Sequence, residues 1–221
     1  MRKINKLLVA NRGEIAIRVF RAASELNIRT VAIFTYEDRY SLHRYKADEA
    51  YKIGADDEPL KPYLDIDEII RVALDNDVDA IHPGYGFLSE NDTFADKCQK
   101  SGIIWIGPDP DTMLKLGDKI QAKKVARQTN VPIVEASLGS IDNLEEAQES
   151  ARSIGYPVMV KAATGGGGRG MRVVREDGDF PKLYQEASGE AKTAFGNGDV
   201  FIEKYIEDPK HIEVQILGSP W

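Results

Sequence analysis

The sequence predicts an α/β protein in which a doubly wound N-terminal domain is followed by a smaller α+β unit. Short apolar runs alternate with helical stripes as far as Gly107 and Pro108, which is typical of a parallel sheet covered by helices. Beyond Gly117 the pattern changes to helices followed by paired β-rich runs. Five glycines within residues 165–170 separate two of these runs.

The first part of the chain predicts strand, helix, strand. Residues 6–10 and 30–34 are the two β-rich runs. Asn27 suits the end of the helix between them. The apolar side chains of that helix recur at helical spacing and are Ile15, Val19, Ala22, Ala23 and Leu26. Further helices are predicted over residues 65–74 and 94–100, strands over 80–82 and 103–106, and a turn-rich loop over 82–86.

The second part predicts a separate α+β unit over residues 132–206. Two helices are expected at 112–116 and 119–128, broken at Gly117, with Asp118 as a candidate N-cap of the second. A helical stripe at Leu144, Ala147, Ala151 and Ile154 ends at Gly155. The remaining expectations are strands over 157–162, 171–174, 200–205 and 211–217, and a helix over 180–194.

Composition narrows the classes of function. The 221 residues carry a net charge of −7 and are 42% hydrophobic, which supports a packed core and argues against a partner held through nucleic-acid phosphates. The net charge does not exclude nucleotide binding, because a nucleotide pocket needs only a few local cations. Cys98 is the only cysteine, so a reducing compartment is expected. The apolar run 7–10 is too short for a signal peptide or a membrane span, and we expect a soluble cytoplasmic enzyme.

The glycine run is too rich for a simple turn. Each glycine in an ordered segment costs about 0.5–1 kcal/mol relative to alanine, and a typical domain is stabilised by only about 5–15 kcal/mol. A structural hairpin needs one or two glycines. The surplus indicates a backbone that must approach a ligand closely and point N–H groups at it, and phosphate is the usual such ligand.

Lys161 strengthens this interpretation because it interrupts an apolar run just before the glycines. A lysine there must reach solvent or meet an anion. At about 4 Å from a phosphate charge, with an effective dielectric near 20, the attraction is about 4 kcal/mol. The alternative is a flexible surface hairpin with a solvated lysine. The loop and the lysine together favour phosphate binding.

Other polar positions are ambiguous from the residues alone. Lys119 would start a helix, where the dipole repels a cation unless an anion is near, so a solvated lysine is the favoured interpretation. Residues 201–206 resemble an adenine-binding strand but fit an exposed edge strand better. His211, Glu213 and Gln215 share one face of a predicted strand that could line a cleft or meet water.

Two further positions follow predicted strands. His82 fits a local structural role somewhat better than a ligand role, and Arg12 could face an anion. No GxGxxG stands at residues 10–16, and the sequence has no CxxC or HExxH motif, so neither dinucleotide binding there nor a transition-metal site is indicated. Cys98 fits a packing role.

Taken together, these segments resemble the biotin carboxylase component of biotin-dependent carboxylases, in the family's order and over nearly the whole chain. The stretches that carry the resemblance are ANRGEIA at 10–16, HPGYGFLSEN at 82–91, GDK at 117–119, GYPVMVK at 155–161, GGGGRGMRVV at 165–174, EKY at 203–205 and HIEVQ at 211–215. Residues 37–54 and 63–70 look more like pyruvate carboxylases than like acetyl-CoA carboxylase subunits.

The resemblance implies an ATP-grasp enzyme with a particular division of the chain. Residues 1–117 would be a Rossmann-like N-terminal biotin carboxylase domain, and residues 118–132 a helical linker. Residues 133–206 would be the ATP-grasp lid, and residues 207–221 the start of a truncated C-terminal ATP-grasp domain.

The resemblance also implies roles for individual residues. Lys119 and Lys161 would contact ATP phosphates, which reverses the interpretation of Lys119 from its position alone. The glycine loop would cover the phosphates; it comprises Gly165, Gly166, Gly167, Gly168, Arg169 and Gly170. Glu203, Lys204, Tyr205 and Ile206 would hold adenine, and His211 would lie beside the ribose.

The implied reaction uses MgATP (or the Mn²⁺ complex) and bicarbonate to form carboxyphosphate, whose carboxyl group passes to biotin on a partner carrier domain. In pyruvate carboxylase, carboxybiotin then converts pyruvate to oxaloacetate. The family's metal-binding carboxylates, bicarbonate-binding arginine and base are expected beyond Trp221, so no catalytic or metal-ligating residue is assigned and the 221-residue chain is expected to be inactive by itself. A homo-oligomer is implied, with no nucleic-acid or membrane partner.

Three alternatives remain at this point. The chain could belong to an acetyl-CoA or propionyl-CoA carboxylase subunit. It could belong to another ATP-grasp ligase, such as one that makes carbamoyl phosphate, although residues 82–91 and 211–215 argue against this. It could also be a non-catalytic fragment that acts as a folded binding module.

Overall fold

The computed structural model describes residues 3–117, 119–137, 139–163, 170–214, 216 and 218. The chain divides into two compact units, residues 1–122 and 123–221. In the part of the chain described, no helix has the length and apolar character needed to cross a membrane.

The first unit contains a five-stranded sheet in which every paired neighbour is parallel. The strand order is β3-β2-β1-β4-β5, which confirms the predicted doubly wound arrangement. The strands are β1 (Lys6–Val9), β2 (Arg29–Phe34), β3 (Glu49–Lys52), β4 (Ala80–His82) and β5 (Ile104–Trp105). The order reverses between β1 and β4, so the carboxyl ends of these two strands form the switch point of the sheet.

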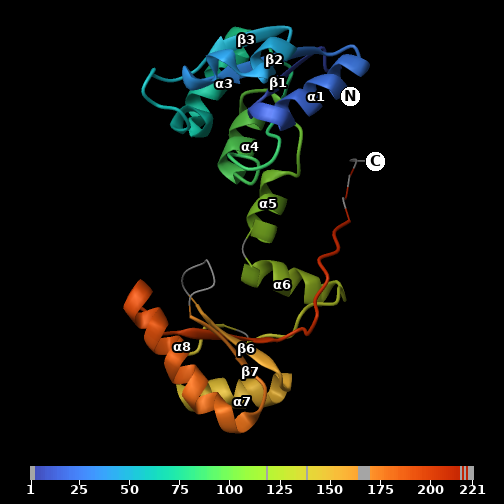
Figure 1. Cartoon of the computed structure of the whole chain (residues 1–221). Coiled ribbons are helices and arrows are strands. Elements are labelled where there is room, and N and C mark those ends of the chain that lie inside the picture. Colours follow the sequence, from blue (N-terminus) through green and yellow to red (C-terminus); the bar gives the residue numbers. More distant parts are fainter. Residues whose placement is uncertain are drawn as a thin grey trace. The chain divides into compact units, whose positions relative to one another are not determined.

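Helices cover both faces of this sheet (Figure 1). They are α1 (Gly13–Glu25), α2 (Leu42–Lys46), α3 (Ile66–Asp75), α4 (Asp92–Lys100) and α5 (Pro110–Gly117), with short 3₁₀ turns at Glu37–Tyr40 and Lys61–Leu64. The helix starts follow from local capping chemistry. The Asp65 side chain accepts the Glu68 amide, and the Asn91 side chain accepts the Phe94 amide.

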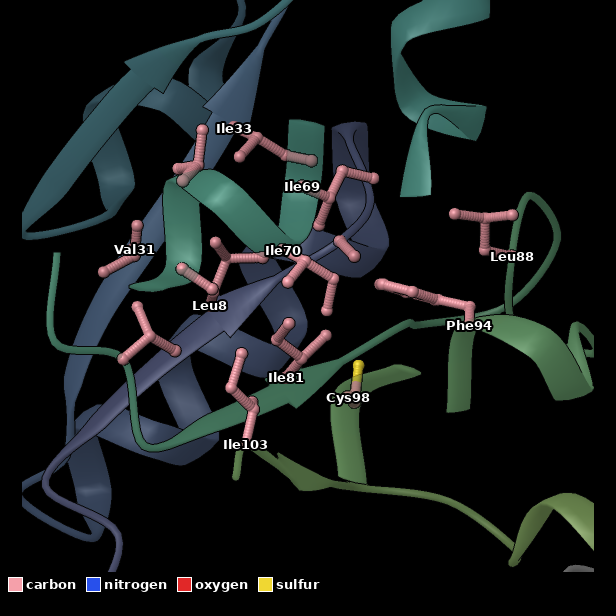
Figure 2. Packing of buried hydrophobic residues seen from close by; sticks show 14 of the residues in the cluster. Leu8, Val31, Ile33, Ile69, Ile70, Ile81, Leu88, Phe94, Cys98 and Ile103 are labelled. Carbon is pink, nitrogen blue, oxygen red and sulfur yellow. The ribbon is translucent and has the colours of Figure 1, made fainter. Parts of the chain in front are cut away.

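The larger core of the first unit lies between the sheet and helices α3 and α4. Figure 2 shows Leu8 and Ile81 from neighbouring strands pointing toward Ile70 of α3 and Phe94 of α4. All four are at most 7% exposed. A smaller cluster on the other face joins Val9 and Ala32 to α1, through Ala16 and Phe20. Strands buried on both faces explain the nearly continuous apolar runs in the sequence.

Strand β3 was not predicted. Its sequence, Glu-Ala-Tyr-Lys, contains no apolar run, and its residues are partly buried or exposed. Among the described strands it is paired with β2 alone, from Val31 opposite Glu49 to Phe34 opposite Lys52. An edge strand with one neighbour tolerates charged side chains, which is why the hydrophobic pattern does not reveal it.

The second unit is built on an antiparallel sheet of order β7-β6-β8. Its elements are α6 (Lys119–Gln128, which begins in the first unit), α7 (Leu144–Ile154), β6 (Val158–Ala162), β7 (Met171–Val174), a 3₁₀ turn at Asp177–Asp179, α8 (Phe180–Phe195) and β8 (Val200–Lys204). The helices and strands agree with the predicted elements to within a residue or two at each end, and the 3₁₀ turn was not predicted. The expected N-cap, Asp118, lies outside the described residues.

Helices α7 and α8 pack against one face of this sheet (Figure 1). Val158 and Val160 of β6 and Val200 and Ile202 of β8 are fully buried beneath them, together with Phe180 of α8. Because side chains alternate along a strand, the residues between these valines and isoleucine face the opposite side.

The predicted strand over residues 211–217 is wrong for residues 211–214, which form neither helix nor strand. Ile212 and Val214 are 81% and 75% exposed. Alternating polar and apolar residues make a strand favourable only when a neighbouring backbone supplies hydrogen bonds and an apolar surface covers one face. The described neighbourhood of residues 211–214 provides neither.

Candidate functional site

The sheet face opposite α7 and α8 is lined by a mixed set of polar and apolar side chains. In the β6–β8 register, Lys161 lies opposite Phe201, and Met159 lies opposite Glu203. All four are partly buried, and all have the parity that points away from the helices. We call this surface, defined by Met159, Lys161, Met171, Phe201 and Glu203, the open face.

A three-residue charge cluster occupies the open face. The Lys161 ammonium lies 2.5 Å from Glu203 Oε2, and the Lys123 ammonium lies 2.9 Å from Glu203 Oε1. The three side chains are 37%, 28% and 20% exposed for Lys161, Lys123 and Glu203 respectively. Each carboxylate oxygen therefore has its own lysine partner.

Lys123 reaches this cluster from α6. Its ammonium also lies 5.0 Å from the centre of the Phe201 ring, within the range of a cation–π contact. Lys123 was not predicted as a site residue, because Lys123 and Lys124 look like a solvated helix surface in the sequence. A position facing β8 from a helix eighty residues earlier carries no sequence signal of its own.

The cluster is electrostatically prepared for an anion. Burial alone would raise the pKa of Glu203, but hydrogen bonds and charges from Lys161 and Lys123 outweigh it and lower that pKa. Glu203 therefore stays ionised at neutral pH and balances one ammonium. The second ammonium has no counter-charge within the cluster, and this excess positive charge favours an anionic ligand.

Apolar side chains flank the charges on the open face. Met171, at the start of β7, is 40% exposed and lies opposite Lys161 in the β6–β7 register. Met159 and Phe201 are partly buried on the same face. A surface with thioether and aromatic groups beside cations suits a ligand with one flat apolar part and one anionic part. A nucleoside triphosphate has both parts. Among the described residues, no group of three or more His, Cys, Asp or Glu side chains could hold a metal ion.

The structure explains why Gly170, the last residue of the glycine run, is a glycine. Gly170 has a φ of +68°, and a Cβ there would lie 3.1 Å from the Cβ of Ala162. Its carbonyl accepts the Ala162 amide at 3.1 Å. The chain thus returns to β7 through a left-handed residue packed closely against β6. The predicted ligands Gly165, Gly166, Gly167, Gly168 and Arg169 lie outside the described residues.

Lys204 lies on β8 next to Glu203, but its side chain points to the helix side of the sheet. Its ammonium donates to the carbonyls of Gly155 and Tyr156 at 2.7 and 3.0 Å. These carbonyls follow the C-terminal end of α7, where a cation is favourable. The Lys204 ammonium therefore stabilises the helix end, and a nucleotide contact by this residue would have to come from its backbone.

The remaining predicted site residues are not joined to the cluster by described contacts. Tyr205 and Ile206 directly follow β8, with Ile206 50% exposed. His211 is 88% exposed, and its Nε2 lies 3.6 Å from Glu213 Oε2. The side chain of Lys119 lies outside the described part. Their roles toward ATP stay predictions.

A second polar network, at the switch point of the first unit, joins the residue Asn11 after β1 to the loop after β4. The Asn11 amide, 3% exposed, donates to the carbonyls of Pro83 and Tyr85 at 2.7 and 2.8 Å. Gly84, between these two residues, has a φ of +68°, and a Cβ there would lie 2.7 Å from Asn11 Nδ2. His82 Nδ1 accepts the Gly84 amide at 2.9 Å, which agrees with a local structural histidine.

Arg12 faces an internal carboxylate. Its guanidinium donates to Asp38 Oδ2 and Oδ1 at 2.6 and 2.5 Å, and the Tyr63 hydroxyl and the Ser41 hydroxyl each donate to the same carboxylate at 2.7 Å. The anion considered for Arg12 in the sequence is thus supplied by the protein itself. No motif in the sequence indicates Asp38 as this partner.

Comparison with protein families gives two matches that follow one another along the chain. Residues 3–113 match the family described as biotin carboxylase, N-terminal domain. Residues 118–219 match the carbamoyl-phosphate synthase L chain, ATP binding domain. The second match covers the open face and the charge cluster of Lys123, Lys161 and Glu203.

Individual relatives agree with these families. The chain is 58% identical to a pyruvate carboxylase of Pichia angusta over 97% of its own length, and 53% identical to that of Bacillus subtilis over 98%. It spans only 18% and 19% of those two proteins. It also resembles the biotin carboxylase domain of the Hydrogenobacter thermophilus 2-oxoglutarate carboxylase, solved with MgADP, ADP and bicarbonate. That match has a TM-score of 0.74 and 47% identity, and it covers 94% of this chain and 45% of the other.

Proposed function

The chain belongs to the biotin carboxylase family, and from this premise we propose that it supplies ATP-binding residues for the carboxylation of biotin with bicarbonate. The Lys161–Glu203–Lys123 cluster on the open face is the observation that carries the proposal. It presents excess positive charge beside an apolar strip, within the segment that matches an ATP-binding family.

The predicted site residues have the following proposed tasks in this reaction. Lys161 binds phosphate oxygens of ATP as a charge-assisted donor. Met159, Met171 and Phe201 exclude water from the nucleotide. Lys119 adds a second phosphate contact, and the backbone amides of residues 165–170 cover the phosphates. Glu203 through Ile206 hold adenine, and His211 lies beside the ribose.

A Mg²⁺ or Mn²⁺ ion bound with ATP would supply positive charge that helps to neutralise the phosphates. The solved 2-oxoglutarate carboxylase domain, which holds MgADP and bicarbonate, supports a metal–nucleotide complex and bicarbonate as the ligands. Biotin would arrive on a carrier domain, and we propose that the enzyme acts as a homo-oligomer in the cytoplasm.

Pyruvate is the proposed final acceptor, which gives oxaloacetate. The high identity to two pyruvate carboxylases supports it. The 47% identity to a 2-oxoglutarate carboxylase domain favours 2-oxoglutarate as a second candidate. The biotin carboxylation half-reaction is the same for both acceptors.

The test is biotin-dependent and bicarbonate-dependent ADP release by the full-length polypeptide, with pyruvate, 2-oxoglutarate or acetyl-CoA offered as acceptor. We expect ADP release to require bicarbonate and the carboxylated product to form from pyruvate. Bicarbonate-independent ATP hydrolysis with no carboxylated product from any acceptor would overturn the proposal. Product from 2-oxoglutarate alone would replace the acceptor and keep the half-reaction.

A further inference from the structure

Glu203 is shared by two lysines that come from different elements. Lys161 stands on β6, next to the glycine run, and Lys123 stands on α6. Each binds a different oxygen of the carboxylate, at 2.5 and 2.9 Å. One carboxylate charge cannot balance two ammonium charges. One lysine can therefore leave the cluster while the other still neutralises Glu203.

This surplus of positive charge becomes important when Lys161 turns from Glu203 to a phosphate. If Lys161 were the only partner of Glu203, that movement would leave the Glu203 carboxylate without a cation beside a triphosphate. The Glu203 side chain is only 20% exposed. A partly buried, unpaired carboxylate is destabilising, and its repulsion of the phosphates would oppose binding. Lys123 prevents this situation because it already holds the other oxygen.

Lys123 is itself fixed in place by β8. Its ammonium contacts both the Glu203 carboxylate and the Phe201 ring. Phe201 and Glu203 are two residues apart on the strand and share the open face. Two contacts from one strand hold the ammonium where it faces Glu203.

We infer that Lys123 is a positioning residue, which keeps the Glu203 carboxylate in place and charge-balanced while Lys161 binds the phosphates of ATP. This inference rests on the proposed function of the open face. It assigns Lys123 no contact with the nucleotide: its effect passes through Glu203.

The first measurement is the affinity of the full-length polypeptide for MgATP by calorimetry. Lys123→Met is expected to weaken binding about fivefold to tenfold, within the range of an ordinary net hydrogen bond, because its effect passes through Glu203. Lys123→Arg, which keeps the charge, should restore affinity to within about twofold. Lys124→Met is the matched control, because Lys124 is the next residue of α6 and is exposed. Equal affinities for Lys123→Met and Lys124→Met would overturn the inference.

A double-mutant cycle with Glu203→Gln tests whether Lys123 acts through the carboxylate. In the Glu203→Gln background, Lys123→Met should change MgATP affinity by less than about twofold. The same loss in both backgrounds would mean that Lys123 contacts the nucleotide directly, and would overturn the positioning role.

Proton linkage separates this role from a purely structural one. Without Lys123, the pKa of Glu203 in the nucleotide complex rises, so the variant should take up a proton when MgATP binds. Calorimetry in two buffers with different ionisation enthalpies measures that uptake, and the affinity of the variant should increase as the pH falls. A variant with weaker binding and no added proton uptake would contradict the inference.

Failure of the proposed function would look different. If the unmodified polypeptide does not bind MgATP, or if Lys161→Ala binds it equally well, the open face is not the nucleotide site and both proposals fall. If Lys161→Ala loses affinity while Lys123→Met behaves like Lys124→Met, the proposed function stands and only the role of Lys123 is wrong.

Discussion

Lys161 and Glu203 form a diagonal ion pair across strands β6 and β8. Their backbones are not direct partners, because Lys161 lies opposite Phe201 and Glu203 lies opposite Met159. The ammonium nevertheless reaches the carboxylate at 2.5 Å. A diagonal pair joins long side chains on a common face, so Lys161 can exchange this partner for a phosphate without any change in strand register.

Replacing Lys161 should impair the use of ATP. Lys161→Ala removes a charge-assisted phosphate contact of about 1.5–3 kcal/mol, which corresponds to a decrease in kcat/KM for ATP of at least about tenfold. Steady-state ADP release by the full-length polypeptide measures it. Lys182→Ala on α8 is the control, because Lys182 is exposed. An unchanged kcat/KM for Lys161→Ala would remove this lysine from the site.

Removing the Asn11 amide should destabilise the first unit. Asn11→Ala leaves the carbonyls of Pro83 and Tyr85 without their donor. A buried unsatisfied group costs about 1–3 kcal/mol and the Tyr85 contact is only partly buried, so we expect a decrease of about 2–4 kcal/mol in the free energy of unfolding. Urea unfolding followed by circular dichroism measures the change. Gln99→Ala, at an exposed helix position, should stay within about 0.5 kcal/mol of the unmodified protein. Equal stability of the two variants would contradict this role of Asn11.

Asp38 should contribute to the loss of stability in acid. Burial would raise the pKa of Asp38, but hydrogen bonds from Arg12, Tyr63 and Ser41 outweigh it and lower that pKa to about 2. A depressed folded-state pKa stabilises the fold above the unfolded-state value, and this contribution is lost as the pH falls toward 2. At 1.36 kcal/mol per pKa unit, the contribution is about 2 kcal/mol.

The variant Asp38→Asn tests this linkage. The free energy of unfolding should be lower than in the unmodified protein near neutral pH, and it should fall less steeply below about pH 4. Urea unfolding at a series of pH values gives both quantities. Asp57→Asn, at an exposed position, should show the same acid dependence as the unmodified protein. Parallel curves for Asp38→Asn and the unmodified protein would refute the assignment.

Cys98 should resist thiol reagents in the folded protein. It is fully buried, and burial raises the pKa of its thiol to about 12. Since the thiolate is the reactive form, labelling with a disulfide reagent near pH 8 should be slow under native conditions and rapid in urea. The ratio of the two rates is the measurement. Rapid native labelling would mean that α4 opens readily or that Cys98 is accessible.

Much of the fold follows from local patterns in the sequence. The apolar runs of β1 and β2 and the stripe of α1 lead directly to a doubly wound sheet. The capping side chains of Asp65 and Asn91 sharpen the starts of α3 and α4. Strand β3 and the segment 211–214 were misjudged for opposite reasons. The first has a neighbour but no apolar pattern, and the second has the pattern but no described neighbour.

The candidate site was predictable only in part. Lys161 is conspicuous because it breaks an apolar strand before a glycine run. Its partner Glu203 was expected at an adenine pocket, and its pairing with two lysines depends on the β6–β8 register, which is a non-local property. Lys123 and Asp38 act through contacts with residues distant in the sequence, and neither lies in a motif that announces it.

The sheet of the second unit has helices α7 and α8 on one face and the candidate ligand surface on the other. Alternate positions along β6 and β8 therefore face either the helices or the candidate ligand surface. Val158, Val160 and Ile202 are constrained by packing and will govern how much folded protein accumulates. Lys161 and Glu203, one position away, lie on the opposite face, and under the proposed function they are constrained by ligand binding. Redesign of the ligand surface can therefore proceed on alternate positions without disturbing the folding core.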